Sequence, residues 1–305
     1  MSDNTPYLII VGGPTASGKT GLAIQLAQHF KTVVLSADSR QFYQGMRIGT
    51  AQPNAEELAA VKHYFINDRP VDKPLNAGAY ADEALAQLQE LFKQHRVVIV
   101  CGGTGLYIRA LIDGLDTFPA IDPNFRETLM QELEEKGLEV MNEELAAKDP
   151  SYFALVDKQN PHRIIRALEV IRATGNTYSS YLQKAPTQRP FKTIQLAIDL
   201  KRNDLYERIN KRVDLMIEEG LEDEVHLLKD YFHLNALQTV GYKEWQDYFN
   251  NTTSKEQCIE DIKQHSRNYA KRQITWFKRD ERVHWLNAAN KEEAITYCEQ
   301  IMNEK

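Results

Sequence analysis

The feature that most constrains the fold is a glycine-rich turn that joins an apolar run to an amphipathic segment near the N-terminus. Residues 13–20 read GPTASGKT, which satisfies the pattern G-x-x-x-x-G-K-[ST]. The run from Tyr7 to Gly12 predicts a buried strand before the turn, and Lys19 to His29 predicts a helix after it. In that order, backbone N–H groups of the turn and the positive end of the helix attract an anionic oxygen cluster. The sequence therefore predicts a phosphate-binding loop between a strand and a helix.

This loop is expected to hold a phosphate or diphosphate chain. Lys19 neutralises negative charge and Thr20 can ligate Mg²⁺. The rest of the binding turn consists of Gly13, Pro14, Thr15, Ala16, Ser17 and Gly18. A chance glycine turn is the alternative, and the strand–loop–helix order argues against it.

Further strand and helix patterns extend this unit. Apolar stretches that predict strands occur at residues 32–36, 63–66, 97–101 and 193–200. Helical spacing occurs at residues 77–94, 203–231 and 254–278. Because the strands show no alternation and helices separate them, they predict a parallel sheet covered on both faces.

The pattern changes in the middle of the chain, where no strand signal is present between residues 115 and 190. Two helices are predicted there from their start and stop residues, one from Asp122-Pro123 to Gly137 and one from Asn160-Pro161 to Gly175. We therefore predict an α/β core formed by residues 1–114 and 191–305, interrupted by a helical insertion domain formed by residues 115–190.

Composition excludes several classes of protein. The 305 residues are 42% hydrophobic and 26% charged, an ordinary globular balance. Three widely spaced cysteines argue against a disulfide framework or a cysteine-rich zinc site and fit a reducing cytosol. No apolar stretch approaches the roughly 20 residues of a membrane helix, and no signal peptide is recognisable. We expect a cytoplasmic protein with no membrane partner. Since its net charge is −6, a nucleic acid would need a local basic patch.

A carboxylate follows the second predicted strand, at Asp38. At the carboxyl end of a parallel strand it would face the ligand crevice, where it can hold a metal or accept a proton from a nucleophile. Capping of the next segment is the alternative role. A Walker-type ATPase would also carry an acidic residue at the end of a neighbouring core strand, whereas the strand at 97–101 is followed by Gly102, Gly103 and Thr104.

Two groups of cations lie near the C-terminus. Lys263, Arg267 and Lys271 repeat every four residues on one helix face, which suits a nucleic-acid backbone. A solvated basic helix is the alternative. Arg208 and Arg212 are also four apart and would supplement Lys19 at the diphosphate, unless they only form surface ion pairs.

Together these motifs resemble those of the tRNA dimethylallyltransferases. The matching segments, in family order, are GPTASGKT (13–20), DSRQ (38–41), IGTAQP (48–53), GGTGLY (102–107), DPNFR (122–126), NPHRIIRALEV (160–170), VGYK (240–243) and AKRQITWF (270–277). The resemblance covers nearly the whole chain. It implies a P-loop kinase-like fold and transfer of a dimethylallyl group from dimethylallyl diphosphate to the exocyclic amine of the adenosine 3′-adjacent to the anticodon in tRNA.

The resemblance also implies roles for individual residues. The loop would grip the diphosphate with Mg²⁺ on Thr20, Asp38 would take up the proton of the attacking amine, and Thr104 would touch the adenosine. Contacts with the anticodon stem-loop of tRNA are implied for Asp38, Ser39, Arg40, Gln41, Thr104, Arg126, His162, Arg163, Ile164, Ile165, Arg166, Gln238, Thr239, Val240, Gly241, Tyr242, Lys243, Arg267 and Lys271. We expect a monomer, because no heptad pattern indicates a coiled coil.

Two other functions are compatible with parts of the sequence. A small-molecule kinase that uses ATP would explain the first 110 residues but gives no reason for the basic helix. A nucleotide-gated RNA-binding protein without catalysis would use the same loop and the same cations.

Overall fold

The computed structural model describes residues 5–182 and 185–304, which divide into two compact units. One unit comprises the described residues of Met1–Gly114 and Gln188–Lys305, and the other is Leu115–Thr187. Arg189 Nη2 donates a hydrogen bond to the Ala110 carbonyl at 3.0 Å. The chain has therefore rejoined the first unit a few residues before the expected boundary at 190. No helix in the described ranges is long and apolar enough to cross a membrane.

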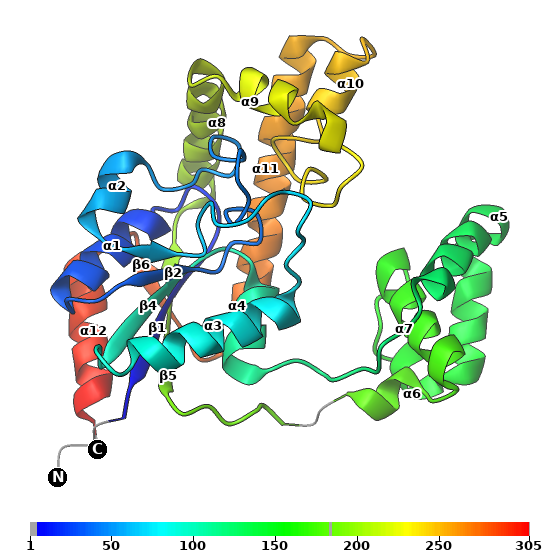
Figure 1. The fold of residues 1–305 in the computed structure, drawn as a ribbon, viewed down its shortest axis with the longest axis horizontal. Helices are drawn as coiled ribbons and strands as arrows, with labels where there is room; N and C mark the ends of the chain where they lie inside the picture. Colours follow the sequence, from blue (N-terminus) through cyan, green and yellow to red (C-terminus); the bar gives the residue numbers. More distant parts are fainter. Residues whose placement is uncertain (1–4, 183–184, 305) are drawn as a thin grey trace. The chain divides into compact units, whose positions relative to one another are not determined.

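A parallel sheet forms the centre of the first unit (Figure 1). Its strands, among the described residues, are β1 (Tyr7–Gly12), β2 (Val34–Ser36), β3 (His63–Tyr64), β4 (Val97–Cys101), β5 (Lys192–Asp199) and β6 (Val283–Asn287). They lie in the order β3-β2-β4-β1-β5-β6, and each neighbouring pair is parallel. The parallel sheet was predicted. The edge strand β6 was not, because its half-buried sequence VHWLN has no continuous apolar run.

The first unit contains helices that cover both faces of this sheet and others that pack together in a separate cluster. They are α1 (Lys19–His29), α2 (Ala55–Ala60), α3 (Ala77–Leu91), α4 (Gly105–Asp113), α8 (Arg202–Glu218), α9 (Leu221–Leu227), η2 (Lys229–Tyr231), α10 (Trp245–Phe249), α11 (Lys255–Phe277) and α12 (Lys291–Asn303). Leu26 of α1 and Cys298 of α12 pack with Ile9 against one face. Leu88 of α3 and Leu111 of α4 pack on the other. This burial on both faces is the reason for the continuous apolar strands.

The predicted helix over residues 203–231 is wrong as a single element. α8 ends at Glu218, Gly220 adopts a left-handed conformation with φ 94°, and α9 begins at Leu221. α9 then gives way to the short helix η2. Gly220 permits this turn because it has no Cβ. The turn allows Leu221 and Val225 of α9 to pack in one cluster with Trp245 of α10.

The second unit, Leu115–Thr187, contains only helices among its described residues. They are α5 (Pro123–Lys148), α6 (Pro150–Phe153), α7 (Pro161–Thr174) and η1 (Tyr178–Tyr181). α5 is interrupted at Gly137, where φ 80° and ψ 169° are not helical, so a second helical segment follows the predicted stop. The predicted bounds of α7 are confirmed, since Asn160 caps its start and Gly175 its end.

Candidate active site

The phosphate-binding loop leaves the first backbone N–H groups of α1 without a side-chain cap. Gly18 occupies the N-cap in a left-handed conformation, φ 95°, and no side chain caps the helix. Lys19 Nζ donates to the Pro14 carbonyl at 2.7 Å, which folds its side chain back over the turn. Ser17 Oγ is buried and has no hydrogen-bond partner among the described residues. An uncapped helix start and an unpaired buried hydroxyl suit the oxygens of a bound anion.

The charge on Lys19 depends on its surroundings. Burial, together with the positive charge of Arg212, lowers the pKa of Lys19 to about 8, while Cys101 and Asp38 oppose the shift. An ammonium group held this way gains strongly from an anionic ligand, because the ligand restores the charge stabilisation that burial removed.

Asp38 lies just beyond the end of β2 and is held by local hydrogen bonds. Its Oδ1 accepts from the Arg40 N–H at 3.0 Å. The next residue, Ser39, donates its N–H to Thr104 Oγ1 at 3.1 Å, which ties this segment to the turn after β4. The close approach requires Gly102, because a Cβ there would come within 2.4 Å of the Ala37 carbonyl oxygen. The segment that carries Asp38 is therefore held next to Thr104.

The carboxyl of Asp38 faces a cavity and is nonetheless poorly solvated. Burial raises its pKa above the ordinary value, whereas the Arg40 backbone hydrogen bond and the charge of Lys19 lower it. A raised pKa makes an aspartate a better proton acceptor once it is ionised. Perturbed lysine and carboxylate groups in one cavity are typical of a functional site.

Gln273 of α11 joins the phosphate-binding loop to the turn after β4. Its Oε1 accepts from the Thr15 N–H at 2.8 Å, and its Nε2 donates to the Gly103 carbonyl at 3.0 Å. A Cβ on Gly103 would lie 2.1 Å from that Nε2, so a larger residue would displace the amide of Gln273. The motif AKRQITWF contained Gln273, but sequence reasoning gave it no role, because a glutamine within a helix carries no signal of its own.

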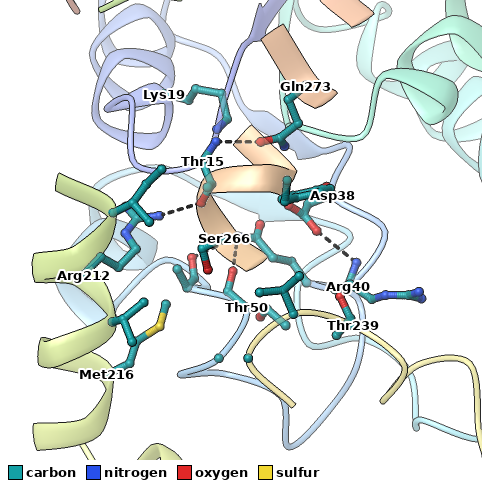
Figure 2. Close-up of a pocket in the computed structure, with 18 of the residues that line it drawn as sticks. Thr15, Lys19, Asp38, Arg40, Thr50, Arg212, Met216, Thr239, Ser266 and Gln273 are labelled. Atoms are coloured by element: carbon teal, nitrogen blue, oxygen red, sulfur yellow. Dashed lines mark hydrogen bonds between the residues drawn. The ribbon is translucent and has the colours of Figure 1, made fainter. Parts of the chain in front are cut away.

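Two adjoining cavities flank the loop. The inner cavity, about 130 Å³, is bordered by Thr15, Lys19, Asp38 and Gln273 and by side chains of α8 and α11 (Figure 2). The outer cavity, about 340 Å³, lies along the loop from Ala16 to Gly21 and the C-terminal half of α8. Residues that border both are Lys19, Thr20, Ala51, Arg212 and Met216. The loop thus lies between the inner cavity, which Asp38 borders, and the outer cavity.

Of the two arginines predicted to supplement Lys19, the structure brings only Arg212 to the cavities. Its Nη1 lies 3.4 Å from Thr15 Oγ1, and it borders both cavities. Arg208 is exposed and borders neither cavity, so its predicted place at the diphosphate is wrong. The physical reason is that α8 directs its buried face, with Ile209 and Val213, toward the site. Arg208 lies outside this face.

Glu224 of α9 organises the inner cavity, and sequence reasoning missed it. Its Oε2 accepts from the N–H groups of Arg47 and Ile48 at 2.9 and 2.7 Å. Its Oε1 accepts from the Gly49 N–H at 2.9 Å and the Tyr242 hydroxyl at 2.6 Å. In the sequence, Glu224 lies in the acidic run EDE, which reads as a solvated face.

Three residues predicted to contact tRNA are buried and cannot do so. Ile164 and Ile165 pack in the core of the helical unit at 0% and 1% exposure. Tyr242 is fully buried with its hydroxyl on Glu224. These predictions are wrong because the motifs were carried over as continuous segments, whereas a helix or turn shows only part of itself to solvent. Thr239, Val240 and Gly241 do border the inner cavity. Gln238 and Lys243, which lie near them in the sequence, are exposed.

The cationic residues predicted to contact tRNA in the helical unit lie at the starts of α5 and α7. His162 and Arg163 are exposed. Arg166 Nη1 lies 2.9 Å from Glu169 Oε2, and Arg126 Nη1 lies 3.4 Å from the same oxygen. One nearly buried carboxylate therefore holds both arginines, whose side chains remain 38% and 43% exposed.

The prediction of a row of free cations on α11 is wrong for Lys263 and Arg267, because residues of α8 pair with them. Lys263 Nζ pairs with Asp214 at 2.9 Å. Arg267 donates to Asn210 Oδ1 at 2.7 Å. Lys271 is exposed and lies 5.9 Å from the centre of the Tyr206 ring. The cations that repeat every four residues on α11 thus lie next to Tyr206, Asn210 and Asp214, which also repeat every four residues on α8.

Two remaining predicted contacts, Arg40 and Gln41, border the inner cavity. Arg40 Nη2 donates to Asn235 at 3.1 Å. Gln41 Nε2 donates to the carbonyls of Thr50 and Ala51 at 3.1 and 2.9 Å. Gln41 therefore holds one wall of the cavity in place.

Comparisons with known proteins agree with this arrangement. The sequence model described as IPP transferase matches residues 41–280. The chain belongs to the IPP transferase family. A relative from Cytophaga hutchinsonii, named tRNA dimethylallyltransferase, is 46% identical and is covered over 100% of both chains.

Solved structures give the same result. The tRNA isopentenylpyrophosphate transferase of Bacillus halodurans is 33% identical, with a TM-score of 0.71 over 97% of this chain and 95% of that one. A eukaryotic dimethylallyltransferase, described as acting on tRNA, is 25% identical, with a TM-score of 0.77 over 97% of this chain and 77% of that one. Membership of a prenyltransferase family supports transfer chemistry over the kinase alternative.

Proposed function

We propose that this protein transfers the dimethylallyl group of dimethylallyl diphosphate to the exocyclic amine of the adenosine 3′-adjacent to the anticodon in tRNA. The observation that carries the proposal is the placement of Asp38 and the phosphate-binding loop on one inner cavity. A kinase would need to hold a γ-phosphoryl group there, whereas a prenyl transfer needs only a leaving diphosphate and a proton acceptor. The family assignment favours the second.

In the proposed reaction the C1–O bond of the allylic diphosphate breaks and a bond from the adenine nitrogen to C1 forms. Lys19, Arg212 and the N–H groups at the start of α1 stabilise the negative charge of the departing diphosphate. Asp38 accepts a hydrogen bond from the amine and takes up the proton that the nitrogen loses. Thr104, which holds the Asp38 segment through Ser39, lies beside the adenosine. Positioning of the weak nucleophile supplies much of the remaining rate.

Mg²⁺ would be held mainly by the diphosphate of the prenyl donor rather than by a cage of protein ligands. Among the described residues no group of three or more His, Cys, Asp or Glu side chains is placed to hold a metal. Mg²⁺ commonly binds through one or two protein oxygens together with substrate phosphates and waters. Thr20, which borders both cavities, would supply the protein oxygen. When bound, Mg²⁺ neutralises part of the diphosphate charge.

The tRNA contacts we propose are residues that border the inner cavity or whose side chains are accessible. Arg40, Thr239, Val240 and Gly241 border the inner cavity, where a flipped-out adenosine would enter. In the helical unit we propose His162, Arg163, Arg166 and Arg126, whose side chains remain accessible. Lys271 is an exposed cation on α11. We further propose that the protein works as a monomer in the cytoplasm.

The test is a comparison of two labelled donors. The protein is incubated with tRNA and either prenyl-labelled dimethylallyl diphosphate or γ-labelled ATP. We expect label in RNA from the prenyl donor alone, with release of diphosphate. Phosphate transfer to any acceptor would instead support the kinase, and binding of tRNA without either product would support the non-catalytic alternative.

A further inference from the structure

Glu169 of α7 is a buried carboxylate, 6% exposed, whose partners are two partly exposed arginines. Its Oε2 accepts from Arg166 Nη1, one helical turn earlier, and from Arg126 Nη1 of α5. Buried ion pairs are often no more stabilising than apolar side chains of similar size, so stability is not a sufficient reason for a charge here. We propose that Glu169 is a positioning residue, which holds Arg126 and Arg166 as a clamp for one backbone phosphate of tRNA. The inference rests on the proposed function and concerns how the substrate RNA is bound.

The charge balance of this group favours a further anion. Two guanidinium groups share one carboxylate oxygen, so these three side chains carry a net charge of +1. Arg172, in the same unit, shows the opposite balance, because it pairs with both Glu132 and Glu144. Two positive charges held on one oxygen repel each other, and an anion bound between them relieves that repulsion. The planar fork of an arginine matches the oxygens of a phosphate.

The two arginines also retain hydrogen-bond donors for a ligand. A guanidinium has five N–H donors. In the described part of the chain, the side chains of Arg126 and Arg166 hydrogen-bond only to Glu169, each through Nη1. Arg172 instead donates from Nε, Nη1 and Nη2 to its two carboxylates. Arg172 is therefore engaged within the protein, whereas the clamp arginines can donate to an RNA phosphate.

An aromatic ring holds Arg166 from a second side. Its Cζ lies 5.0 Å from the centre of the Phe118 ring, in a cation–π contact. The Phe118 ring stacks in turn on Tyr178, with ring centres 4.9 Å apart and an angle of 21° between the planes. These contacts order Arg166 before RNA binds. Because the ordering of a flexible side chain on binding weakens affinity by about 2- to 12-fold, arginines that are already ordered bind more tightly.

The variant Glu169→Gln tests this role through the direction of its effect. The amide keeps the size of the side chain but loses the charge that holds both arginines. We expect the KM for tRNA to rise by about 5- to 100-fold, because both arginines then have to be ordered on binding. The kcat and the KM for dimethylallyl diphosphate should stay the same, since Asp38 and the phosphate-binding loop belong to the other unit. A carboxylate that merely repelled RNA would give the opposite result, a lower KM for tRNA after its removal.

The experiment measures transfer kinetics and, separately, tRNA affinity between about 50 and 200 mM salt. Loss of one clamped phosphate should reduce the slope of log affinity against log salt by about 0.7–0.9. Glu144→Gln is the matched control, because it makes the same charge change in the same unit and removes a partner of Arg172. It should leave the salt slope and the KM for tRNA unchanged. Circular dichroism checks folding. If Glu169→Gln is unfolded, Glu169→Asp draws the carboxylate back from the arginines and should also raise the KM for tRNA.

A double-mutant cycle separates positioning from direct contact with RNA. When Arg126 and Arg166 are both replaced by alanine, Glu169→Gln should not raise the KM for tRNA further, because Glu169 acts only through them. A further rise in that background overturns the role of Glu169. An unchanged or lower KM in Glu169→Gln itself, or an equal rise in Glu144→Gln, overturns it as well, and both leave the proposed function intact. A wild type that transfers no prenyl group to tRNA overturns the proposed function, and the inference with it.

Discussion

The strongest quantitative expectation concerns Glu224, whose single carboxylate accepts four hydrogen bonds. Three come from consecutive backbone N–H groups of residues 47–49 and one from the hydroxyl of Tyr242. These donors belong to two segments that shape the inner cavity, and Gly49 itself borders it. In Glu224→Gln one oxygen becomes an NH₂ group, which faces donors instead of accepting from them.

The cost follows from the number of donors that lose their acceptor. The substituted oxygen serves two of the four donors, and each partly buried donor left unpaired costs about 1–3 kcal/mol. We therefore expect the free energy of unfolding to fall by about 2–5 kcal/mol, allowing for partial rearrangement. A domain has only about 5–15 kcal/mol in total. Activity should fall as well, because residues 47–49 and the turn at Tyr242 lose their common anchor.

Urea unfolding with linear extrapolation measures this loss, and the fluorescence of the fully buried Trp245 in the same cluster reports it. Asp223→Asn, the neighbouring exposed position on α9, removes the same charge and should change the free energy of unfolding by less than about 1 kcal/mol. Tyr242→Phe should cost less in the Glu224→Gln background than in the wild type, since the two residues share a hydrogen bond. Equal stability of wild type and Glu224→Gln would refute the reasoning.

Four further expectations concern the residues of the site. Asp38→Ala should lower single-turnover transfer by about 10²- to 10⁴-fold with little change in tRNA affinity; loss of affinity with intact turnover of bound tRNA would contradict its role. Because burial lowers the pKa of Lys19 to about 8, its positive charge is lost as pH rises through that value, so donor affinity of the free protein should decline above about pH 8 and not below it. The raised pKa of Asp38 should place the acid limb of kcat/KM above the ordinary carboxylate range, and this limb should disappear in the residual activity of Asp38→Ala. Gln273→Leu should raise the KM for the donor, because the Thr15 N–H and the Gly103 carbonyl lose their partner; a donor KM like that of the wild type would show that the bridge is dispensable.

Local patterns were sufficient to predict the central elements of the fold. β1, the phosphate-binding loop and α1 follow from a continuous apolar run, a glycine turn and a helical repeat, each of which acts over a few residues. Asn160 and Gly175 likewise marked the ends of α7, because capping depends on residues next to the helix end. The edge strand β6 was missed because its sequence has no continuous apolar run. The break at Gly220 was missed because a single glycine does not clearly end a helical pattern.

The sequence by itself determined the chemistry that the protein carries: a phosphate-binding loop with Lys19 and Thr20, and a carboxylate at Asp38 one strand away. Tertiary structure alone decided which other side chains reach that chemistry. Arg212 borders the site while Arg208 does not, and Lys263 and Arg267 are engaged along α8. Glu224 and Gln273 bind backbone groups far away in the chain. The physical reason is that a motif records local backbone geometry and residue type, whereas burial and pairing depend on the elements that fold against each side chain.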